Sequence, residues 1–157
     1  MNLLLITSDN HRDAEILKNI AMRHPDYEYY LHAGDSEMTE EELRPFVSVK
    51  GNNDYLALPK QRVITTESGT ILMTHGHLVF GPSSLARMAK EVSANLVITG
   101  HSHVPMHRIV DGIQMINPGA LSHPRSGHHY SYALLRKTPS QRFWEVTFHV
   151  FSNPPLY

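Results

Sequence analysis

Five apolar runs in this sequence each end in side chains that commonly bind divalent metal ions. These side chains are two carboxylates, one amide and four imidazoles: Asp9 and His11, then Asp35, Asn52 and His75, and finally His101 and His103. Glycine stands beside most of them, which lets the backbone turn sharply and approach a ligand closely. In an extended segment, residues i and i+2 point to the same face, so each two-residue pair is expected to aim at one place. The pattern therefore predicts that five distant segments converge on a single site.

This set of donors indicates two metal ions rather than one. Seven donors are too many for a single tetrahedral zinc, and the chain has no cysteine to supply the sulfur of a typical structural zinc site. Mixed nitrogen and oxygen donors suit borderline ions of the Mn, Fe, Zn or Ni class, with one carboxylate shared between two of them. Two such ions lie ~3.5–4 Å apart, clamp the attacking and leaving oxygens of a phosphoryl displacement, and lower the pKa of water toward neutrality.

Each residue taken singly also has an ordinary structural interpretation. Asp9 could cap the helix that follows it, and the segment 51–54 has the composition of a turn. His24, His149 and the pair at 128–129 are interpreted as surface or loop histidines. The metal interpretation is favoured because the pattern recurs at five strand ends.

Apolar periodicity predicts an α/β fold that positions these residues. The expected strands are 3–6, 27–35, 46–54, 95–103, 130–136 and 142–150, with hairpins over 62–77, turning at Ser68-Gly69, and over 108–119, turning at Asp111-Gly112. The expected helices are 12–24, a short helix opened by a Thr39/Glu42 capping box, and 85–92, opened by Ser83 or Ser84. Strand–helix alternation followed by antiparallel strands indicates a mixed sheet, or two packed sheets, with helices outside. Ligand groups are expected at the carboxyl ends of the strands.

Composition limits the class of protein. A length of 157 residues is most simply one domain, spanning 1–157. Fourteen basic and fifteen acidic residues form no basic tract, so no charge pattern predicts binding to nucleic acid or to a membrane. The apolar run Leu3 to Ile6 is too short for a signal sequence or a membrane span, and cysteine is absent, so a cytoplasmic protein is expected. A homo-oligomer is left open.

The motifs together resemble the calcineurin-like metallophosphoesterases. The resemblance is carried, in chain order, by Asp-x-His at 9, Gly-Asp at 34, Gly-Asn-x-Asp at 51, Thr-His-Gly-His at 74 and Gly-His-x-His at 100. The short length and the sequence INPGA at 116–120 are most similar to the small prokaryotic phosphodiesterase branch, to which the scaffold subunit of retromer is also related. The resemblance implies an α/β fold of two packed mixed β-sheets flanked by helices, a four-layer α-β-β-α arrangement.

The resemblance also assigns the metal ligands. One ion would be held by four residues, Asp9, His11, Asp35 and His103. The second would be held by Asp35, Asn52, His75 and His101, so that Asp35 bridges the pair. The implied activity is a phosphodiesterase in which a metal-bridging hydroxide attacks phosphorus in line, with two divalent ions, Mn first among them, as cofactors and a small phosphodiester as substrate.

One position departs from the family pattern. Where many superfamily members have a histidine that protonates the leaving group, this chain has Asn53, whose amide can orient a phosphate but cannot act as an acid. His77 and His123 are candidates to supply the proton, and Asp35, Asn53 and His77 are the expected catalytic residues. Arg12 could contact a phosphate or simply be solvated. Two alternatives remain: an inactive binding scaffold, and a phosphomonoesterase of small metabolites.

Overall fold

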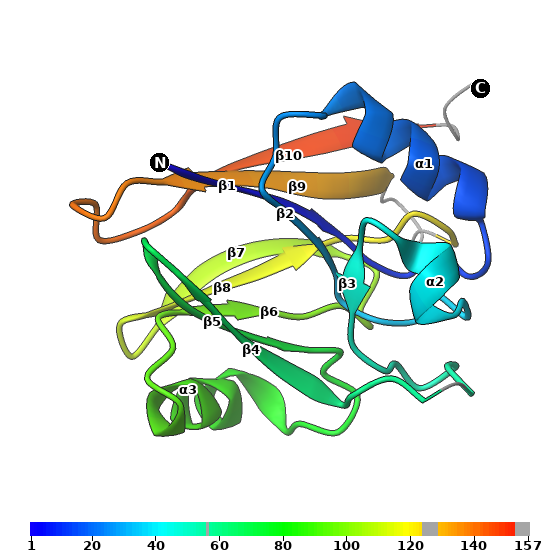
Figure 1. Ribbon diagram of the computed structural model, residues 1–157. Helices are drawn as coiled ribbons and strands as arrows, with labels where there is room; N and C mark the ends of the chain where they lie inside the picture. Colours follow the sequence, from blue (N-terminus) through cyan, green and yellow to red (C-terminus); the bar gives the residue numbers. More distant parts are fainter. Residues whose placement is uncertain (56, 124–128, 153–157) are drawn as a thin grey trace.

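The computed structural model describes residues 1–55, 57–123 and 129–152, which form two β-sheets and three helices (Figure 1). The first sheet has the strand order β10-β9-β1-β2-β3, where the strands are β1 (Asn2–Thr7), β2 (Tyr29–His32), β3 (Val47–Ser48), β9 (Tyr130–Lys137) and β10 (Glu145–Phe151). The second has the order β4-β5-β6-β8-β7, where the strands are β4 (Gln61–Thr66), β5 (Gly69–Thr74), β6 (Leu96–Ile98), β7 (Pro105–Val110) and β8 (Ile113–Pro118). The helices are α1 (Ala14–Arg23), α2 (Glu40–Leu43) and α3 (Gly81–Glu91).

Both sheets are mixed. In the first, β1 pairs in parallel with β2, and β2 with β3, while β9 and β10 are antiparallel. In the second, β5, β6 and β8 run parallel, and β4 and β7 close the edges as antiparallel hairpin partners. The parallel strands therefore end on a common edge of each sheet.

The sheets pack face to face, and helices cover both outer faces (Figure 1). Leu4 and Ile6 of β1 join Ile71 and Ile98 of the second sheet in the core between the sheets. Leu5 points the opposite way and packs with buried residues of α1 and α2. On the far side, buried residues of α3 pack on the outer face of the second sheet, at Leu72, Val97 and Met115. The four-layer α-β-β-α fold is thus confirmed, and the unbroken apolar run of β1 is explained by burial on both faces.

Several local predictions are also confirmed. Thr39 and Glu42 form the expected capping box at the start of α2. The β7–β8 hairpin turns at Asp111 and Gly112, whose φ angles of 52° and 80° are the left-handed values that a type I′ turn requires.

Other boundaries were predicted wrongly. Helix α3 begins at Gly81, with Pro82 in its first turn, and neither Ser83 nor Ser84 caps it. Proline is favoured in the first turn because its missing N–H needs no partner there. The β4–β5 turn lies one residue earlier than expected, because Thr66 pairs with Gly69. Strands β2 and β3 are much shorter than 27–35 and 46–54, because the polar residues that follow them leave the ladder to form loops.

Among the described residues, no helix is long and apolar enough to cross a membrane. The cytoplasmic location stays a prediction.

Candidate metal centre

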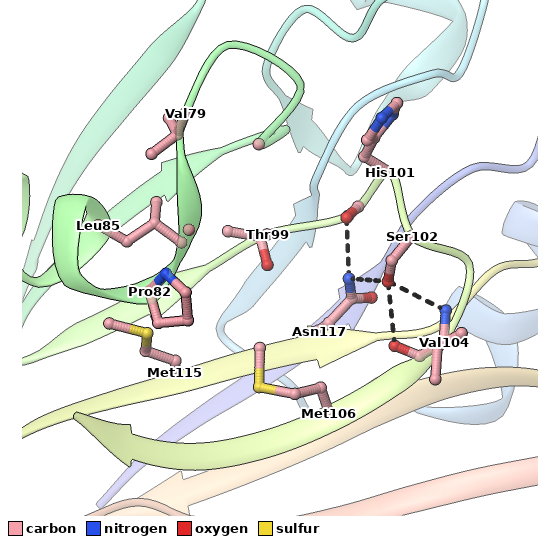
Figure 2. Close-up of a pocket in the computed structure, with 13 residues that line it drawn as sticks. Val79, Pro82, Leu85, Thr99, His101, Ser102, Val104, Met106, Met115 and Asn117 are labelled. Carbon is pink, nitrogen blue, oxygen red and sulfur yellow. Dashed lines mark hydrogen bonds between the residues drawn. The ribbon is translucent and has the colours of Figure 1, made fainter.

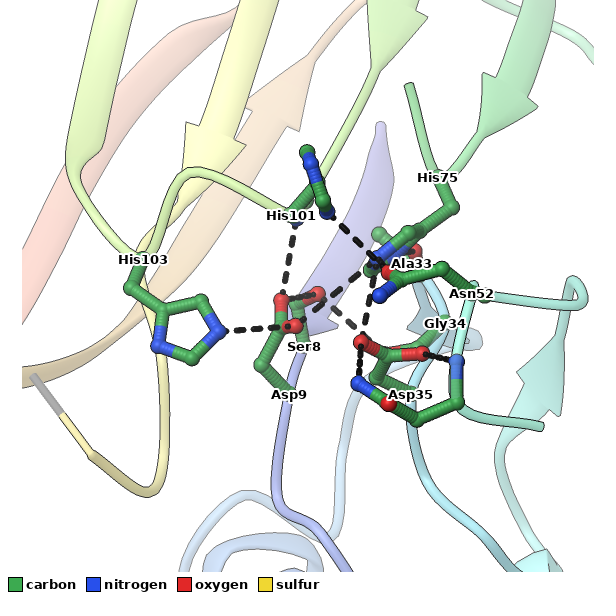
Figure 3. Close-up of polar contacts among 12 residues, drawn as sticks. Ser8, Asp9, Ala33, Gly34, Asp35, Asn52, His75, His101 and His103 are labelled. Carbon is green, nitrogen blue, oxygen red and sulfur yellow. Dashed lines mark hydrogen bonds and ion pairs between the residues drawn. The ribbon is translucent and has the colours of Figure 1, made fainter. Parts of the chain in front are cut away.

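The seven predicted ligands follow the carboxyl ends of parallel strands from both sheets. Asp9 and His11 come after β1, Asp35 after β2, and Asn52 after β3. His75 follows β5, and His101 and His103 follow β6. The two edges meet, so these side chains converge from both sides of the sandwich, as Figure 3 shows for all but His11.

The two-residue spacings had suggested an extended backbone at these positions. The structure shows a different conformation. Five of the seven residues have φ between 41° and 68°, in the left-handed region: Asp9, His11, Asp35, His101 and His103. Such conformations are uncommon for residues with side chains and occur where the surrounding structure imposes them, often at functional sites. The expected convergence is present, but tight loops produce it rather than the alternation of a strand.

Hydrogen bonds between the loops hold this backbone in place. The Asp9 N–H donates to the Gly34 carbonyl at 3.0 Å, and the His11 N–H donates to the Asp35 carbonyl at 3.1 Å. These bonds continue the pairing of β1 with β2 beyond the strand ends. The loops that carry Asp9 and Asp35 are therefore joined to each other by the backbone.

Asn117, in the INPGA segment, organises the loop that carries the last two histidines. Its amide donates to the Gly100 carbonyl at 2.8 Å and to the Ser102 hydroxyl at 3.0 Å, as Figure 2 shows. Its oxygen accepts from the Gly119 N–H at 2.9 Å. All of these bonds are made within the protein, so Asn117 is a positioning residue.

Two glycines allow the loops to approach the carboxylates. A methyl group at Gly100 would lie 2.9 Å from Asp9 Oδ2, and one at Gly51 would lie 2.7 Å from the carboxyl carbon of Asp35. Both distances are far below ordinary van der Waals contact, so no larger residue fits without moving a carboxylate.

Asp9 lies at the centre of the cluster and is completely buried. Its Oδ2 accepts hydrogen bonds from the Ser8 hydroxyl and, at 3.2 Å, from the His101 N–H. Its Oδ1 lies 3.2 Å from His103 Nε2 and 3.9 Å from the Nε2 atoms of His11 and His75, but none of these contacts is aligned as a hydrogen bond. Burial raises the pKa of Asp9, but contact with His103 and the charge of His75 lower it by more, so the group is ionised.

Asp35 is the second buried carboxylate. Its Oδ1 accepts from the Asn53 N–H at 2.8 Å, and its Oδ2 accepts from the Asn53 amide at 3.0 Å and lies 3.3 Å from His75 Nε2. Burial acts to raise the pKa of Asp35, but the hydrogen bonds from His75 and Asn53 outweigh it and hold the pKa well below its usual range. Asn53, an expected catalytic residue, has its amide directed at Asp35.

His75 is buried between the two carboxylates, and its orientation is fixed. Its Nδ1 lies 2.7 Å from the Ala33 carbonyl, so the proton on Nδ1 is donated there and Nε2 faces the cluster (Figure 3). Metal-binding histidines usually have such a backbone partner for the second nitrogen. Burial lowers the pKa of His75, but the hydrogen bond to Asp35 and the charge of Asp9 raise it by more. The two carboxylates thus favour the protonated form of this ring.

Asn52 joins two of the imidazoles. Its Oδ1 lies 3.0 Å from His75 Nε2 and 3.1 Å from His101 Nδ1. Burial and the charge of His75 lower the pKa of His101, which favours the neutral ring that can bind a metal. These three side chains are three of the four ligands expected for the second ion.

His103 and His11 lie on the other side of Asp9. His103 Nδ1 is 2.8 Å from the His123 carbonyl, which aims Nε2 at Asp9. His11 Nε2 is buried without a hydrogen-bond partner in the described part of the chain, and its Nδ1 lies 3.6 Å from the Glu37 carboxylate. Glu37 was not singled out from the sequence, because no motif marks it.

The residues present fit divalent cations. The ligand atoms of Asp9, His11 and His103 lie within 4.8 Å of one another, as do those of Asp9, Asp35 and His75. Asp9 Oδ1 and His11 Nε2 face each other, buried and without hydrogen bonds among the described residues, although a buried polar atom normally has a partner. A cation between them would satisfy both. Asp9 belongs to both groups, whereas the resemblance makes Asp35 the bridge, so the bridging assignment stays a prediction.

Asp54, the last residue of the Gly-Asn-x-Asp motif, supports the backbone. Its carboxylate accepts from three N–H groups, those of Asp35 at 3.0 Å, Gly51 at 2.8 Å and Glu37 at 2.7 Å. It therefore holds the loop after β2 against the loop after β3. A sequence shows that such a carboxylate is present but not which donors will surround it.

The two candidates for a proton donor both lie beside the cluster. The ring of His77 is 5.3 Å from that of His75 and 6.2 Å from that of His101, and its Nδ1 is buried without a hydrogen bond among the described residues. Burial and the charge of His75 lower the pKa of His77. The ring of His123 lies 5.8 Å from that of His11. Arg12 is mostly exposed and lies 3.8 Å from Glu37.

The remaining histidines lie elsewhere. His24 is half-buried, with Nε2 2.9 Å from the Tyr132 hydroxyl, which is itself 3.3 Å from His149 Nδ1. His24 is thus more enclosed than the surface histidine expected from the sequence. His128 lies outside the described residues.

Comparison with known proteins identifies the family. The model of the calcineurin-like phosphoesterase superfamily domain matches residues 1–138. The chain is 38% identical to the Probable metallophosphoesterase YsnB of Bacillus subtilis, over 86% of this chain and 83% of that protein. It is 30% identical to Phosphodiesterase YfcE of Escherichia coli K12, over 69% of this chain and 61% of that protein.

Solved structures of similar proteins have the same fold. A predicted phosphoesterase from Streptococcus pneumoniae superposes with a TM-score of 0.87 at 30% identity, over 95% of this chain and 89% of that one. Vps29 from Entamoeba histolytica, complexed with Zn²⁺, superposes with a TM-score of 0.71 at 23% identity, over 94% of this chain and 98% of that one, and shares the fold. The chain belongs to the calcineurin-like phosphoesterase superfamily. The predicted family and the predicted class of enzyme, a metal-dependent phosphoric ester hydrolase, are confirmed.

Proposed function

We propose that this protein is a phosphodiesterase that depends on two divalent metal ions and acts on a small phosphodiester. The observation that carries the proposal is the pair of buried atoms Asp9 Oδ1 and His11 Nε2, which lie 3.9 Å apart at the centre of the cluster and make no hydrogen bond with any described residue. The name of the Escherichia coli relative, a phosphodiesterase, supports the choice of a diester. The near-neutral chain, with no basic tract, favours a small substrate over a nucleic acid.

The proposed ligand sets divide the cluster in two. Asp9, His11, Asp35 and His103 hold one ion, and Asp35, Asn52, His75 and His101 hold the other. Bound divalent ions supply Lewis acidity and lower the pKa of water toward neutrality, so that it can attack phosphorus in line. Manganese suits these mixed nitrogen and oxygen donors, as do Zn, Fe and Ni.

The protein's own groups fix and orient this arrangement. Asn53 holds Asp35 through two hydrogen bonds, at 2.8 and 3.0 Å, and thus orients the shared carboxylate. The ring of His77 lies 5.3 Å from that of His75 and 6.2 Å from that of His101, beside the proposed second ion, and His77 is the group proposed to bond to an ester oxygen of the substrate. His101 and Asn52 are exposed, so the substrate enters from their side.

Metal content and hydrolysis test the proposal together. Protein stripped with a chelator is reloaded with Mn, Zn, Fe or Ni separately, the bound metal is measured by mass spectrometry, and hydrolysis of bis(4-nitrophenyl) phosphate is followed. Two ions per chain and turnover with at least one metal are expected. Asp35→Asn should lose both ions and nearly all turnover, while Asp111→Asn, the same change in the β7–β8 turn, should change neither. No turnover with any of the metals would overturn the enzymatic proposal and leave the scaffold alternative.

A second comparison separates diesters from monoesters. The compounds 4-nitrophenyl methyl phosphate and 4-nitrophenyl phosphate have the same leaving group. The ratio of their hydrolysis rates therefore reports the substrate class alone. Preference for the diester supports the proposal, and preference for the monoester would assign the protein as a phosphomonoesterase.

A further inference from the structure

An apolar pocket opens directly beside the metal centre. It has a volume of about 350 Å³ and lies between α3, the loop after β5 and the β7–β8 hairpin. Pro82 and Leu85 of α3 line it together with Met106 and Met115 of the β7–β8 hairpin, as Figure 2 shows. The protein therefore has a cavity large enough for a small organic group, although no motif of the sequence pointed to it.

The pocket shares a wall with the metal centre. His101 lines one end of the pocket, and its Nδ1 on the other side lies 3.1 Å from Asn52 Oδ1. Gly76, between His75 and His77, also lines it. A phosphoryl group bound at the metal ligands would thus have the pocket within reach of one of its ester oxygens.

The polar groups of the pocket are few. The Asn117 amide is committed to Gly100 and Ser102 and cannot serve a ligand. The Thr99 hydroxyl points into the pocket and makes no hydrogen bond within the described chain. At the rim, Phe80 is 97% exposed beside the lining residue Val79. Such a lining selects a mainly apolar group.

We propose that this pocket binds an aromatic ester group of the substrate, so that the preferred substrate is a phosphodiester with a ring of one or two cycles close to phosphorus. The inference rests on the proposed function and adds the chemical class of the substrate. Size supports it, because a cavity of about 150 Å³ already holds benzene. The two methionines support a ring over an aliphatic chain, because thioether sulfur makes favourable contacts with aromatic edges.

Binding of phosphonates tests the assignment without turnover. A phosphonate carries one carbon substituent, so only that group can enter the pocket. Titration calorimetry of the manganese-loaded protein with methyl-, n-butyl- and phenylphosphonate should show phenylphosphonate binding at least tenfold more tightly than methylphosphonate, and more tightly than n-butylphosphonate. Val79→Trp, which fills the pocket from a partly exposed loop, should bring the ratio of phenyl to methyl affinity close to one. The matched control Val150→Trp, on β10 of the other sheet, should leave that ratio unchanged.

Three outcomes would overturn the inference. Equal affinity for the phenyl and methyl compounds in the wild-type protein would show that no ring subsite exists, and hydrolysis of the aryl diester by the same preparation would show that the proposed function still stands. Tighter binding of the butyl compound would assign the pocket to an aliphatic chain. Failure to bind any phosphonate, together with absence of hydrolysis, would overturn both proposals.

The source of the ring is decided by a substrate pair. Both compounds have a 4-nitrophenyl leaving group. In thymidine 5′-(4-nitrophenyl phosphate) the other ring is a base carried on a deoxyribose, whereas in 4-nitrophenyl phenyl phosphate it is a phenyl group carried directly on the ester oxygen. One of the two compounds is expected to be hydrolysed faster than the other. Loss of this difference in Val79→Trp, and its retention in Val150→Trp, supports the proposal. The faster compound then identifies the substrate as a nucleoside diester or as a simple aryl diester. Equal effects of the two variants on both substrates would contradict it.

Discussion

The close approach of Gly51 to Asp35 allows a sharp test of how the metal centre is held. The φ angle of Gly51 is not in the left-handed region, so alanine can adopt its backbone conformation. The only obstacle to Gly51→Ala is the space that the new methyl group would need. It would lie 2.7 Å from the carboxyl carbon of Asp35 and 2.5 Å from the Asp35 nitrogen.

The size of the effect follows from these distances. Ordinary van der Waals contact begins near 3.4 Å, so relative to Gly51 the Asp35 nitrogen must move by at least 0.9 Å and the carboxyl carbon by at least 0.7 Å. Metal–ligand distances tolerate deviations of only about 0.2 Å. A misplacement of about 1 Å at a reacting centre can reduce the rate by about 100-fold. We therefore expect Gly51→Ala to lower manganese affinity by at least about tenfold and kcat/KM by about 100-fold.

Calorimetric titration with manganese and hydrolysis of bis(4-nitrophenyl) phosphate measure the two effects. The control is Gly112→Ala in the β7–β8 turn, where φ is 80° and the nearest atom to the new methyl group is 3.8 Å away. This change strains the backbone by about 1–2 kcal/mol but touches no ligand. It should lower the melting temperature and leave manganese affinity unchanged. Wild-type manganese affinity in Gly51→Ala, with the protein folded, would refute the idea that Gly51 sets the position of Asp35.

Three further predictions concern stability and the loops. Asp54→Asn replaces one acceptor oxygen by an N–H donor that faces backbone N–H groups. Manganese affinity, measured by calorimetry, should therefore fall by about 10- to 100-fold. An affinity equal to that of the wild type would contradict the positioning role of Asp54. Burial lowers the pKa of His32 to about 4, so between pH 6.5 and 4 the unfolded chain takes up a proton that the folded chain does not. In the metal-free protein, the stability advantage of wild type over His32→Gln should therefore shrink by about 3 kcal/mol from pH 7 to pH 4 in urea unfolding, and a constant difference would contradict the burial argument. Manganese at about 100 times its dissociation constant should stabilise the fold by about 2.7 kcal/mol per independent site, and a melting temperature unaffected by chelator would exclude binding to the folded state.

The sequence identified the ligand types and their order because each set follows an apolar run that can only be a buried strand. His75 and His101 could be assigned to one place, since parallel strands end on a common edge. The conformation of the ligand loops could not be predicted. Asp9 and His101 adopt left-handed φ angles of 54° and 68°, and those values are imposed by hydrogen bonds between loops far apart in the chain.

The supporting residues were missed for the same reason. Glu37, the His123 carbonyl and the amide of Asn117 act on ligands or loops that lie far from them in the sequence. Their roles depend on tertiary proximity, which no local pattern encodes. The apolar pocket was also invisible, because its lining combines ordinary core residues such as Leu85 and Met115, whose periodicity indicates only a buried helix face and a buried strand.

The backbone hydrogen bonds that extend the pairing of β1 and β2 into the loops after them have a consequence for how cations come and go. Because Asp9 and His11 are bonded at 3.0 and 3.1 Å to Gly34 and Asp35, the donors stand ready before any ion arrives. Capture then requires an ion to shed its hydration shell and to displace any proton on His75, but it requires no rearrangement of the backbone. We therefore expect one ion to exchange for another within the intact fold, so that the bound metal depends on which ion the surroundings supply.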